Sequence, residues 1–217
     1  MTTSSILRVT EIFHSIQGES TYAGRPCVFV RLTGCPLRCT WCDTEYAFHG
    51  GSEMTMEEVV AKVRAYGCGL VEVTGGEPLH QPESLPLVKQ LCVEGFEVLI
   101  ETSGAIDIAL VDDRAHIILD VKCPGSGMTD RMVWSNLERL TMKDEVKFVI
   151  KDRTDYDWAC DIVRKYDLAS RCAVLFSPVF GELNLRHLAE WILADRLNVR
   201  FQLQMHKLIW SPDMRGV

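Results

Sequence analysis

Short runs of apolar residues recur along the chain, and a stretch with helix-like spacing follows most of them. The runs are nearly continuous rather than alternating, which is typical of strands buried on both faces of a parallel sheet. They predict strands over residues 27–33, 70–74, 96–101, 117–121, 145–150, 172–177 and 199–203. Strands that alternate with helices indicate a parallel α/β fold, in which sites form at the carboxyl ends of the strands.

The stretches between these runs carry helix signals. Thr55 and Glu58 have the spacing of a capping box, in which each side chain can satisfy the other's backbone donor. Apolar residues then fall on one helical face up to Gly67, which can end the helix in a left-handed turn. The same one-sided pattern recurs over 158–166, and again over 185–193 behind Asn184 as a possible N-cap.

The length of the chain restricts the choice of α/β fold. A complete eight-unit barrel usually takes about 250 residues, whereas this chain has 217. The connection between Glu101 and Ile117 is also too short for a full crossover helix. We therefore expect one domain over 1–217 that forms a partial, open (β/α) barrel with reduced helices. An ordinary doubly wound sheet is the structural alternative.

Composition narrows the class of protein. Hydrophobic residues make up 47% of the chain, enough for a sizeable core. No apolar run approaches the roughly 18 residues of a membrane helix, and the N-terminal sequence lacks the layout of a secretory signal. The net charge is −7 and the basic residues are scattered, which argues against a nucleic-acid surface. These features indicate a protein that acts on something small.

The nine cysteines fall into two groups. The chain is too long and too apolar to need disulfide staples, which favours reduced cysteines and a cytoplasmic location. Free buried cysteine behaves as a small hydrophobe. Six cysteines are scattered, mostly among apolar neighbours, and are expected to be such core or near-core residues: Cys27, Cys68, Cys92, Cys123, Cys160 and Cys172. The other three lie within eight residues of one another.

Those three, Cys35, Cys39 and Cys42, have the spacing C-x3-C-x2-C directly after a predicted strand. Thiolates are the usual ligands of iron–sulfur clusters. Three ligands for a [4Fe–4S] cluster leave one iron open, which suits a cluster that activates a substrate. The alternative is a zinc knuckle, but structural zinc takes four ligands, and the nearby candidates Cys27 and His49 have no familiar spacing.

The cysteine spacing resembles the signature of the radical S-adenosylmethionine (SAM) superfamily. The resemblance implies that SAM chelates the open iron and that the reduced cluster releases a 5′-deoxyadenosyl radical from it. Gly75-Gly-Glu-Pro78 follows the next predicted strand and resembles the superfamily's GGEP motif, whose backbone holds the amino group of the cofactor. Thr102-Ser-Gly104 and Asp120-Val-Lys122 end the next two strands, where its carboxylate and ribose would lie.

The resemblance assigns a set of residues to the cofactor, with Trp41 on the adenine side. The set comprises Trp41, Cys42, Asp43, Gly76, Glu77, Ser103, Asp120, Val121 and Lys122. Plain structural roles exist for some of them. Trp41 could be a hydrophobic cover, the glycine pair a simple turn, and Lys122 a solvated charge.

Further motifs lie on both sides of the cysteines. The segment 12–20, IFHSIQGES, and Arg31 precede them, Cys42-Asp-Thr44 follows, and 202–207, QLQMHK, lies near the end. Together and in this order they resemble the 7-carboxy-7-deazaguanine synthase family across nearly the whole chain. That family rearranges 6-carboxy-5,6,7,8-tetrahydropterin to 7-carboxy-7-deazaguanine with loss of ammonia, on the route to queuosine. The resemblance implies a radical SAM carbon–nitrogen lyase with a short N-terminal substrate-binding segment and a C-terminal tail.

The family resemblance also implies Mg2+ at Thr44, whose hydroxyl is a hard oxygen ligand. Glu19 could accept from amino and ring N–H groups of a pterin, and Arg31 could bind its carboxylate with a forked pair of hydrogen bonds. The full substrate set is Ile16, Gln17, Gly18, Glu19, Arg31, Thr74, His206 and Val217.

Alternative roles exist for several of these residues. Without the resemblance, residues 17–19 could be an ordinary turn and Thr44 a helix cap. His206, expected on the last strand, could be a core histidine, and Val217 could belong to a frayed end.

Two other classes of function compete with this one. A glycyl-radical-enzyme activase shares the cysteine spacing, but it does not explain the polar residues Gln17, Glu19 and Arg31 ahead of the cluster. A non-catalytic metal-binding module is the other rival. The predicted partners are the small pterin substrate, an electron donor such as flavodoxin or ferredoxin, and a second copy of the chain in a homodimer. No nucleic acid or membrane partner is expected.

Overall fold

Nine strands form one sheet in the computed structural model, which describes residues 5–217. They are β1 (Ile6–Ile16), β2 (Pro26–Leu32), β3 (Ser52–Thr55), β4 (Leu70–Gly75), β5 (Glu97–Thr102), β6 (His116–Val121), β7 (Glu145–Ile150), β8 (Ala173–Pro178) and β9 (Arg200–Phe201). The order is β3-β1-β2-β4-β5-β6-β7-β8-β9. From β2 onward all neighbours are parallel, whereas β1 runs antiparallel to both β2 and β3.

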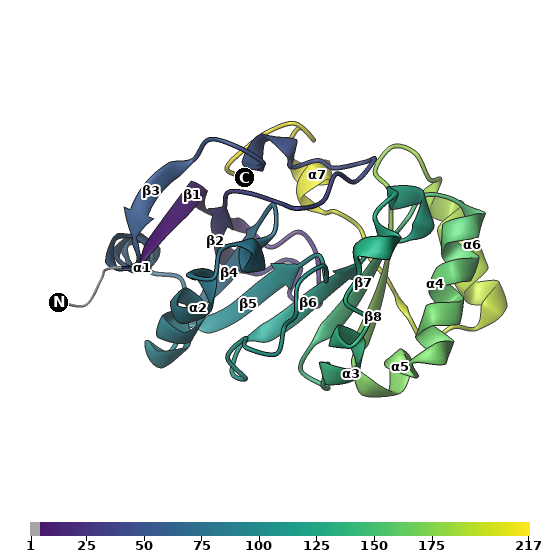
Figure 1. Cartoon of the computed structure of the whole chain (residues 1–217). Helices are drawn as coiled ribbons and strands as arrows, with labels where there is room; N and C mark the ends of the chain where they lie inside the picture. The colour runs from purple at the N-terminus through teal and green to yellow at the C-terminus, as the bar shows by residue number, and fades with distance from the viewer. Residues whose placement is uncertain (1–4) are drawn as a thin grey trace.

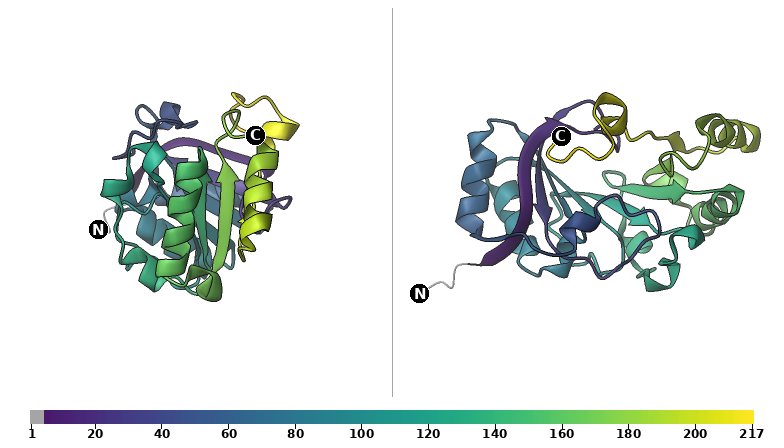
Figure 2. Two further views of the ribbon diagram at one scale, coloured as in Figure 1. Left: turned by 90° about the vertical axis from the view of Figure 1, so that its right-hand side faces the viewer. Right: turned by 90° about the horizontal axis from the view of Figure 1, so that it is seen from above.

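This order decides between the two expected architectures. After β2 each new parallel strand joins the sheet beside the preceding one, without the reversal of strand order that a doubly wound sheet contains. The sheet curls, with β3 at one edge and β9 at the other (Figures 1 and 2). The prediction of a partial, open (β/α) barrel is confirmed. All seven predicted strands are present, although β9 is shorter than expected, and β1 and β3 were not predicted.

The helices are short, as expected for a reduced barrel. They are α1 (Met56–Ala65), α2 (Ser84–Val93), α3 (Asn136–Arg139), α4 (Arg153–Lys165), α5 (Leu168–Arg171), α6 (Leu185–Asp195) and α7 (His206–Ile209), with 3-10 turns η1 (Glu45–Ala47), η2 (Pro78–His80), η3 (Pro124–Ser126) and η4 (Thr129–Arg131). The capping box of α1 and the Asn184 cap of α6 both form. Between β5 and β6 the described chain contains no helix. Within residues 5–217 no helix is long and apolar enough to span a membrane.

The two faces of the sheet differ in chemistry because successive side chains of a strand point to opposite sides. On β4, Val71 and Val73 join the main core under the helices. Leu70 belongs to a smaller apolar cluster on the inner face, and Glu72 and Thr74 follow it on that side. The inner face is therefore apolar at its base and polar toward the carboxyl ends of the strands.

Candidate active site

A cavity of about 740 Å3 lies on the inner face, at the carboxyl ends of the strands. It is lined by every residue that the sequence predicted for the cluster, cofactor, metal and substrate, except Glu77 and Val121. The segments that bring them together are the loop after β1, the cysteine loop after β2, the ends of β4 to β7, and the C-terminal segment. Residues that were predicted for different ligands, from distant parts of the sequence, thus line the same cavity.

The cysteine loop follows β2 and is held by backbone contacts. Arg38 donates from one guanidinium nitrogen to the carbonyl oxygens of Cys35 (2.8 Å) and Leu37 (2.6 Å), and Thr40 Nα donates to Ser126 O (3.2 Å). All three cluster thiols are free and partly exposed. Burial raises the pKa of each thiol, so ligation of iron must release its proton.

Gly76 lets the GGEP segment approach the cysteine loop closely. A Cβ at this position would come within 2.6 Å of Gly34 O and 2.7 Å of Cys35 Cβ, which no side chain could tolerate. Gly76 itself lines the cavity beside Cys35. The glycine is therefore needed to keep the two cofactor-binding segments in contact.

Glu77 and Val121 lie behind the cavity wall. The Glu77 carboxylate is fully buried and accepts hydrogen bonds from Leu79 N (3.0 Å), Thr102 Oγ1 (2.9 Å) and Ser103 N (2.7 Å). Its side chain thus fixes Ser103, which does line the cavity. The Val121 side chain belongs to the core under the helices. Neither side chain faces the cavity, so the predicted cofactor contacts could come only from their backbones.

A buried lysine that the sequence analysis missed lines the cavity. Lys147 on β7 pairs with Glu19 (2.9 Å), with Asp120 (3.5 Å) and with Glu101. Burial lowers the pKa of a lysine, but the three carboxylates hold the pKa of Lys147 well above its ordinary value. Lys147 therefore stays charged and connects a predicted substrate residue, Glu19, with a predicted cofactor residue, Asp120.

Glu19 and Asp43 are further linked through the C-terminal segment. Gln204 donates to Glu19 (3.0 Å) and to Asp43 (3.3 Å), and Lys207 pairs with Asp43 (2.5 Å). Burial raises the pKa of Glu19, but Lys147 and Gln204 outweigh it and lower the pKa overall. Burial also acts to raise the pKa of Asp43. Pairing with Lys207 acts in the opposite direction, and the pKa of Asp43 lies below its ordinary value. Both carboxylates are ionised at neutral pH.

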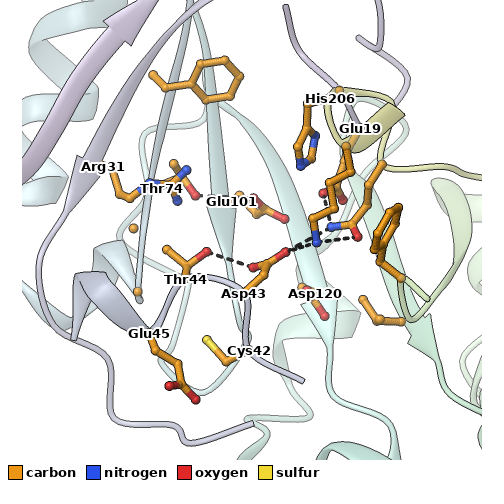
Figure 3. Close-up of a pocket in the computed structure, with 18 of the residues that line it drawn as sticks. Glu19, Arg31, Cys42, Asp43, Thr44, Glu45, Thr74, Glu101, Asp120 and His206 are labelled. Atoms are coloured by element: carbon orange, nitrogen blue, oxygen red, sulfur yellow. Dashed lines mark hydrogen bonds and ion pairs between the residues drawn. The ribbon is translucent and has the colours of Figure 1, made fainter. Parts of the chain in front are cut away.

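Arg31 already has a partner inside the protein. Its Nε donates to Glu11 (2.8 Å), which also accepts from Tyr46 Oη (2.8 Å). Within the described residues the two terminal guanidinium nitrogens make no hydrogen bond, so they remain available for a carboxylate. Figure 3 shows Arg31 and Thr74 across the same space from Glu19 and His206.

The segment 16–19 lines the cavity, but the Gln17 side chain already has partners inside the protein. The Gln17 side chain is tied into the protein, because its Nε2 donates to Glu72 and its Oε1 accepts from Glu19 N (2.9 Å). Its backbone N–H and C=O are also engaged, by Arg25 and Gly24 (both 2.8 Å). Gln17 thus shapes the loop, and it lines the cavity together with Ile16, Gly18 and Glu19.

His206 differs from the sequence prediction in its secondary structure. It is the first residue of α7 and not part of the last strand, which ends at Phe201. Its ring packs against Gly18, where a Cβ would lie 2.2 Å from the His206 Nδ1 atom. Burial lowers the pKa of His206, although Glu19 opposes this, so the imidazole is neutral at neutral pH. His206 lines the cavity, and its contact with substrate stays a prediction.

Thr44 and the chain end also reach the cavity. Thr44 precedes η1 without a capping hydrogen bond, and its hydroxyl instead donates to Asp43 (2.9 Å; Figure 3). The tail returns over the loop after β2, where the Arg215 guanidinium lies 4.1 Å from the centre of the Tyr46 ring. Val217 lines the cavity, as do residues 212–216.

Several cavity residues escaped the sequence analysis for a common reason. Glu72, Glu101 and Lys147 lie inside strands whose apolar neighbours dominate the pattern. A charge flanked by buried apolar residues is unusual, since burial of an unpaired charge is costly. That signal could have marked Val71-Glu-Val73 and Val146-Lys-Phe148 as strands with one polar face, whereas Glu101 has an apolar neighbour on one side only, Ile100.

The fit of the site to an iron–sulfur cluster and SAM rests on its donors. Three thiols stand at one end of the cavity, and Asp120 Oδ1 is buried without a hydrogen-bond partner inside residues 5–217. Orphaned buried acceptors are rare unless a ligand supplies the donor. Among the same residues, no three His, Cys, Asp or Glu side chains gather for a single metal ion.

An open, curled parallel sheet with three thiols after its first parallel strand and a glycine pair after the next defines a radical SAM enzyme. Comparison with known families agrees, because the model of the Radical SAM superfamily matches residues 29–193. More narrowly, the chain belongs to the 7-carboxy-7-deazaguanine synthase family, a group of radical SAM carbon–nitrogen lyases. The family, the fold class and the reaction type predicted from sequence are confirmed.

The relatives cover the full chain. The 7-carboxy-7-deazaguanine synthase of Koribacter versatilis is 47% identical, over 97% of this chain and 100% of its own. That of Chlorobaculum tepidum is 46% identical over 100% of both. The crystal structure of QueE from Escherichia coli matches with a TM-score of 0.77 at 24% identity, covering 93% of this chain and 95% of that one. This last likeness supports the fold.

Proposed function

We propose that the chain converts 6-carboxy-5,6,7,8-tetrahydropterin to 7-carboxy-7-deazaguanine and ammonia, and that the cavity holds substrate and cofactor together. The observation that carries this proposal is the single cavity that has cluster thiols at one end and Arg31 and Glu19 on opposite sides. An anion-binding guanidinium and an ionised carboxylate suit a flat molecule with a carboxylate at one end and N–H donors at the other. A glycyl-radical-enzyme activase would not need this polar pair.

The residues of the chain divide between the two ligands. Cys35, Cys39 and Cys42 would hold the [4Fe–4S] cluster, which with SAM supplies a radical that abstracts hydrogen. Gly76, Ser103, Asp120 and Lys122 stand where they can position SAM, and the free Oδ1 of Asp120 is an acceptor for one of its hydroxyls. Trp41, between Cys39 and Cys42 on the cysteine loop, lines the same cavity.

Anaerobic incubation tests the proposed reaction directly. Reconstituted protein, SAM, a reductant and the carboxytetrahydropterin should yield 7-carboxy-7-deazaguanine, identified by mass and absorbance. Cleavage of SAM without consumption of the pterin would show that the substrate is a different one. The proposed homodimer, the flavodoxin or ferredoxin donor and the cytoplasmic location stay predictions.

Arg31→Ala should weaken binding of the pterin at least about tenfold, because a charge-assisted hydrogen bond in a buried site contributes roughly 1.5–3 kcal/mol. Glu19→Ala should have a similar effect from the other side of the cavity. Equilibrium binding of substrate to the unreduced holoenzyme measures both. Arg25→Ala is the matched control, since Arg25 pairs with Glu97 away from the cavity. Unchanged affinity in both test variants would exclude the proposed orientation.

Mg2+ is proposed to bind at Thr44 together with substrate. Mg2+ keeps several waters and needs few protein ligands, so one hydroxyl at the cavity wall is sufficient. Thr44→Ala should weaken the dependence of turnover on Mg2+ while SAM cleavage continues. Titration of Mg2+ in wild type and variant measures this, with Thr40→Ala on the same loop, outside the cavity lining, as the control. Superimposable titrations would remove Thr44 from the metal site.

A further inference from the structure

Glu72 is a buried carboxyl group that neither the sequence analysis nor the proposed ligand contacts use. It lies in the middle of β4 on the inner face, two residues before Thr74, and lines the cavity although only 3% of it is exposed. Its Oε2 accepts a hydrogen bond from the Gln17 amide. Within residues 5–217 its Oε1 has no hydrogen-bond partner, so this oxygen is the part of the group that can meet a ligand.

The surroundings of Glu72 favour its neutral form. The charged and titratable groups that face it come from four directions: Glu19 after β1, Cys27 and Arg31 on β2, Glu101 on β5, and Lys147 on β7. Burial, Glu101 and Glu19 raise the pKa of Glu72 well above its ordinary value, and Lys147 and Arg31 oppose this less strongly. Lys147 is already shared by three other carboxylates. These surroundings favour the protonated form of Glu72, and its Oε1 is the oxygen left free at the cavity.

The proposed reaction needs such a group. Product and ammonia together contain the atoms of the substrate, so an amine must leave protonated and a ring carbon must lose a proton. Neither Lys147 nor His206 suits the donation of the first proton. The ion pairs of Lys147 raise its pKa, so it keeps its proton. The pKa of His206 is lowered, so its imidazole is neutral. A carboxyl group with a raised pKa can both donate and accept a proton near neutral pH.

We propose that Glu72 is the general acid and base of the ammonia-loss step, an inference that rests on the proposed function. As the C–N bond of the rearranged ring breaks, its electron pair leaves with nitrogen, and the Glu72 O–H proton forms the new N–H bond. The Glu72 carboxylate then removes a proton from the adjacent ring carbon. The C–H electron pair becomes the C=C bond of the aromatic ring, and the carboxyl group is restored. No oxidant or reductant is consumed.

Glu72→Gln tests this role, because the amide keeps the shape, the neutrality and the contact with Gln17 but cannot transfer a proton. Three quantities are measured: pterin affinity, transfer of deuterium from labelled substrate to 5′-deoxyadenosine, and formation of product. We expect affinity and deuterium transfer within about threefold of wild type, and a fall in product formation of about 10²–10⁴-fold. Glu145→Gln, another buried carboxyl on the sheet but outside the cavity lining, should leave all three unchanged.

Two outcomes would overturn the proposal. Product formation within about threefold of wild type in Glu72→Gln would show that no proton passes through this group. Parallel loss of affinity and deuterium transfer would show that Glu72 only positions Gln17. Wild-type protein that leaves the pterin unconsumed would instead refute the proposed function.

A pH series on wild-type protein tests the same role even if the Glu72→Gln variant does not fold. The yield of product per 5′-deoxyadenosine should fall as the pH rises and Glu72 loses its proton. A yield independent of pH would overturn the proposal as well.

Discussion

Replacement of Cys35, Cys39 or Cys42 by alanine is expected to abolish reductive cleavage of SAM. Each thiolate holds one corner of the proposed cluster, and the loop offers no substitute ligand, because the other six cysteines lie outside the cavity lining. Loss of one ligand should therefore release iron or leave a cluster that cannot be reduced with SAM bound. Iron content, the absorbance of the reconstituted cluster and the yield of 5′-deoxyadenosine measure the effect.

Cys160→Ala is the control for these variants. Cys160 is buried between α4 and the sheet, and its removal deletes a small apolar group without touching the cavity. It should bind iron and cleave SAM like wild type. Protein that takes up zinc but no iron on anaerobic reconstitution would contradict the assignment of all three cysteines.

Lys147→Met is expected to destabilise the fold by about 3–5 kcal/mol at neutral pH, because it leaves Glu19, Glu101 and Asp120 without their shared cation. Chemical denaturation compares its free energy of unfolding with that of wild type. The matched control is Lys151→Met, directly after the same strand β7. Lys151 makes a half-exposed ion pair with Glu182 (3.6 Å), so its loss should cost less than about 0.5 kcal/mol.

The pH dependence of the Lys147 variant follows from the sign of one pKa shift. In wild type, ion pairing with Lys147 helps to lower the pKa of Glu19 against the opposing effect of burial. A lowered folded-state pKa contributes stability above the unfolded pKa, and this stability is lost as the pH falls through the folded pKa. The variant lacks this contribution, so the difference in free energy of unfolding between wild type and Lys147→Met should become smaller as the pH falls. If this difference in free energy of unfolding did not change with pH, packing and not charge would account for the lower stability of the variant.

The charged residues inside the strands mark the limit of sequence reasoning here. The apolar runs that predicted buried strands contain three charged residues, Glu72, Glu101 and Lys147. The structure has strands at all three places. A run of apolar residues shows that a strand is buried, but it does not show which face meets a core and which meets a cavity. In an open barrel the inner face holds a ligand space, so charges are tolerated there where they can pair across neighbouring strands.

Contacts between distant segments were equally hidden. The sequence predicted roles for Glu19 and His206, but not that Gln204 joins Glu19 to Asp43 or that His206 packs on Gly18. It placed His206 on a strand, whereas the chain turns into α7 there. Such contacts depend on the path of the C-terminal segment back over the cysteine loop, which no local pattern specifies.

The amino-acid sequence by itself determined the class of fold and the family. Continuous apolar runs fixed the parallel strands, and the cysteine spacing with its flanking motifs identified the chemistry, because both signals are local and survive without knowledge of the packing. Only the tertiary structure decided which charged side chains pair with one another inside the cavity. The charge of Lys147, the raised pKa of Glu72 and the enclosure of Glu77 behind the cavity wall all depend on burial and on partners from separate segments, and those exist only once the sheet has curled.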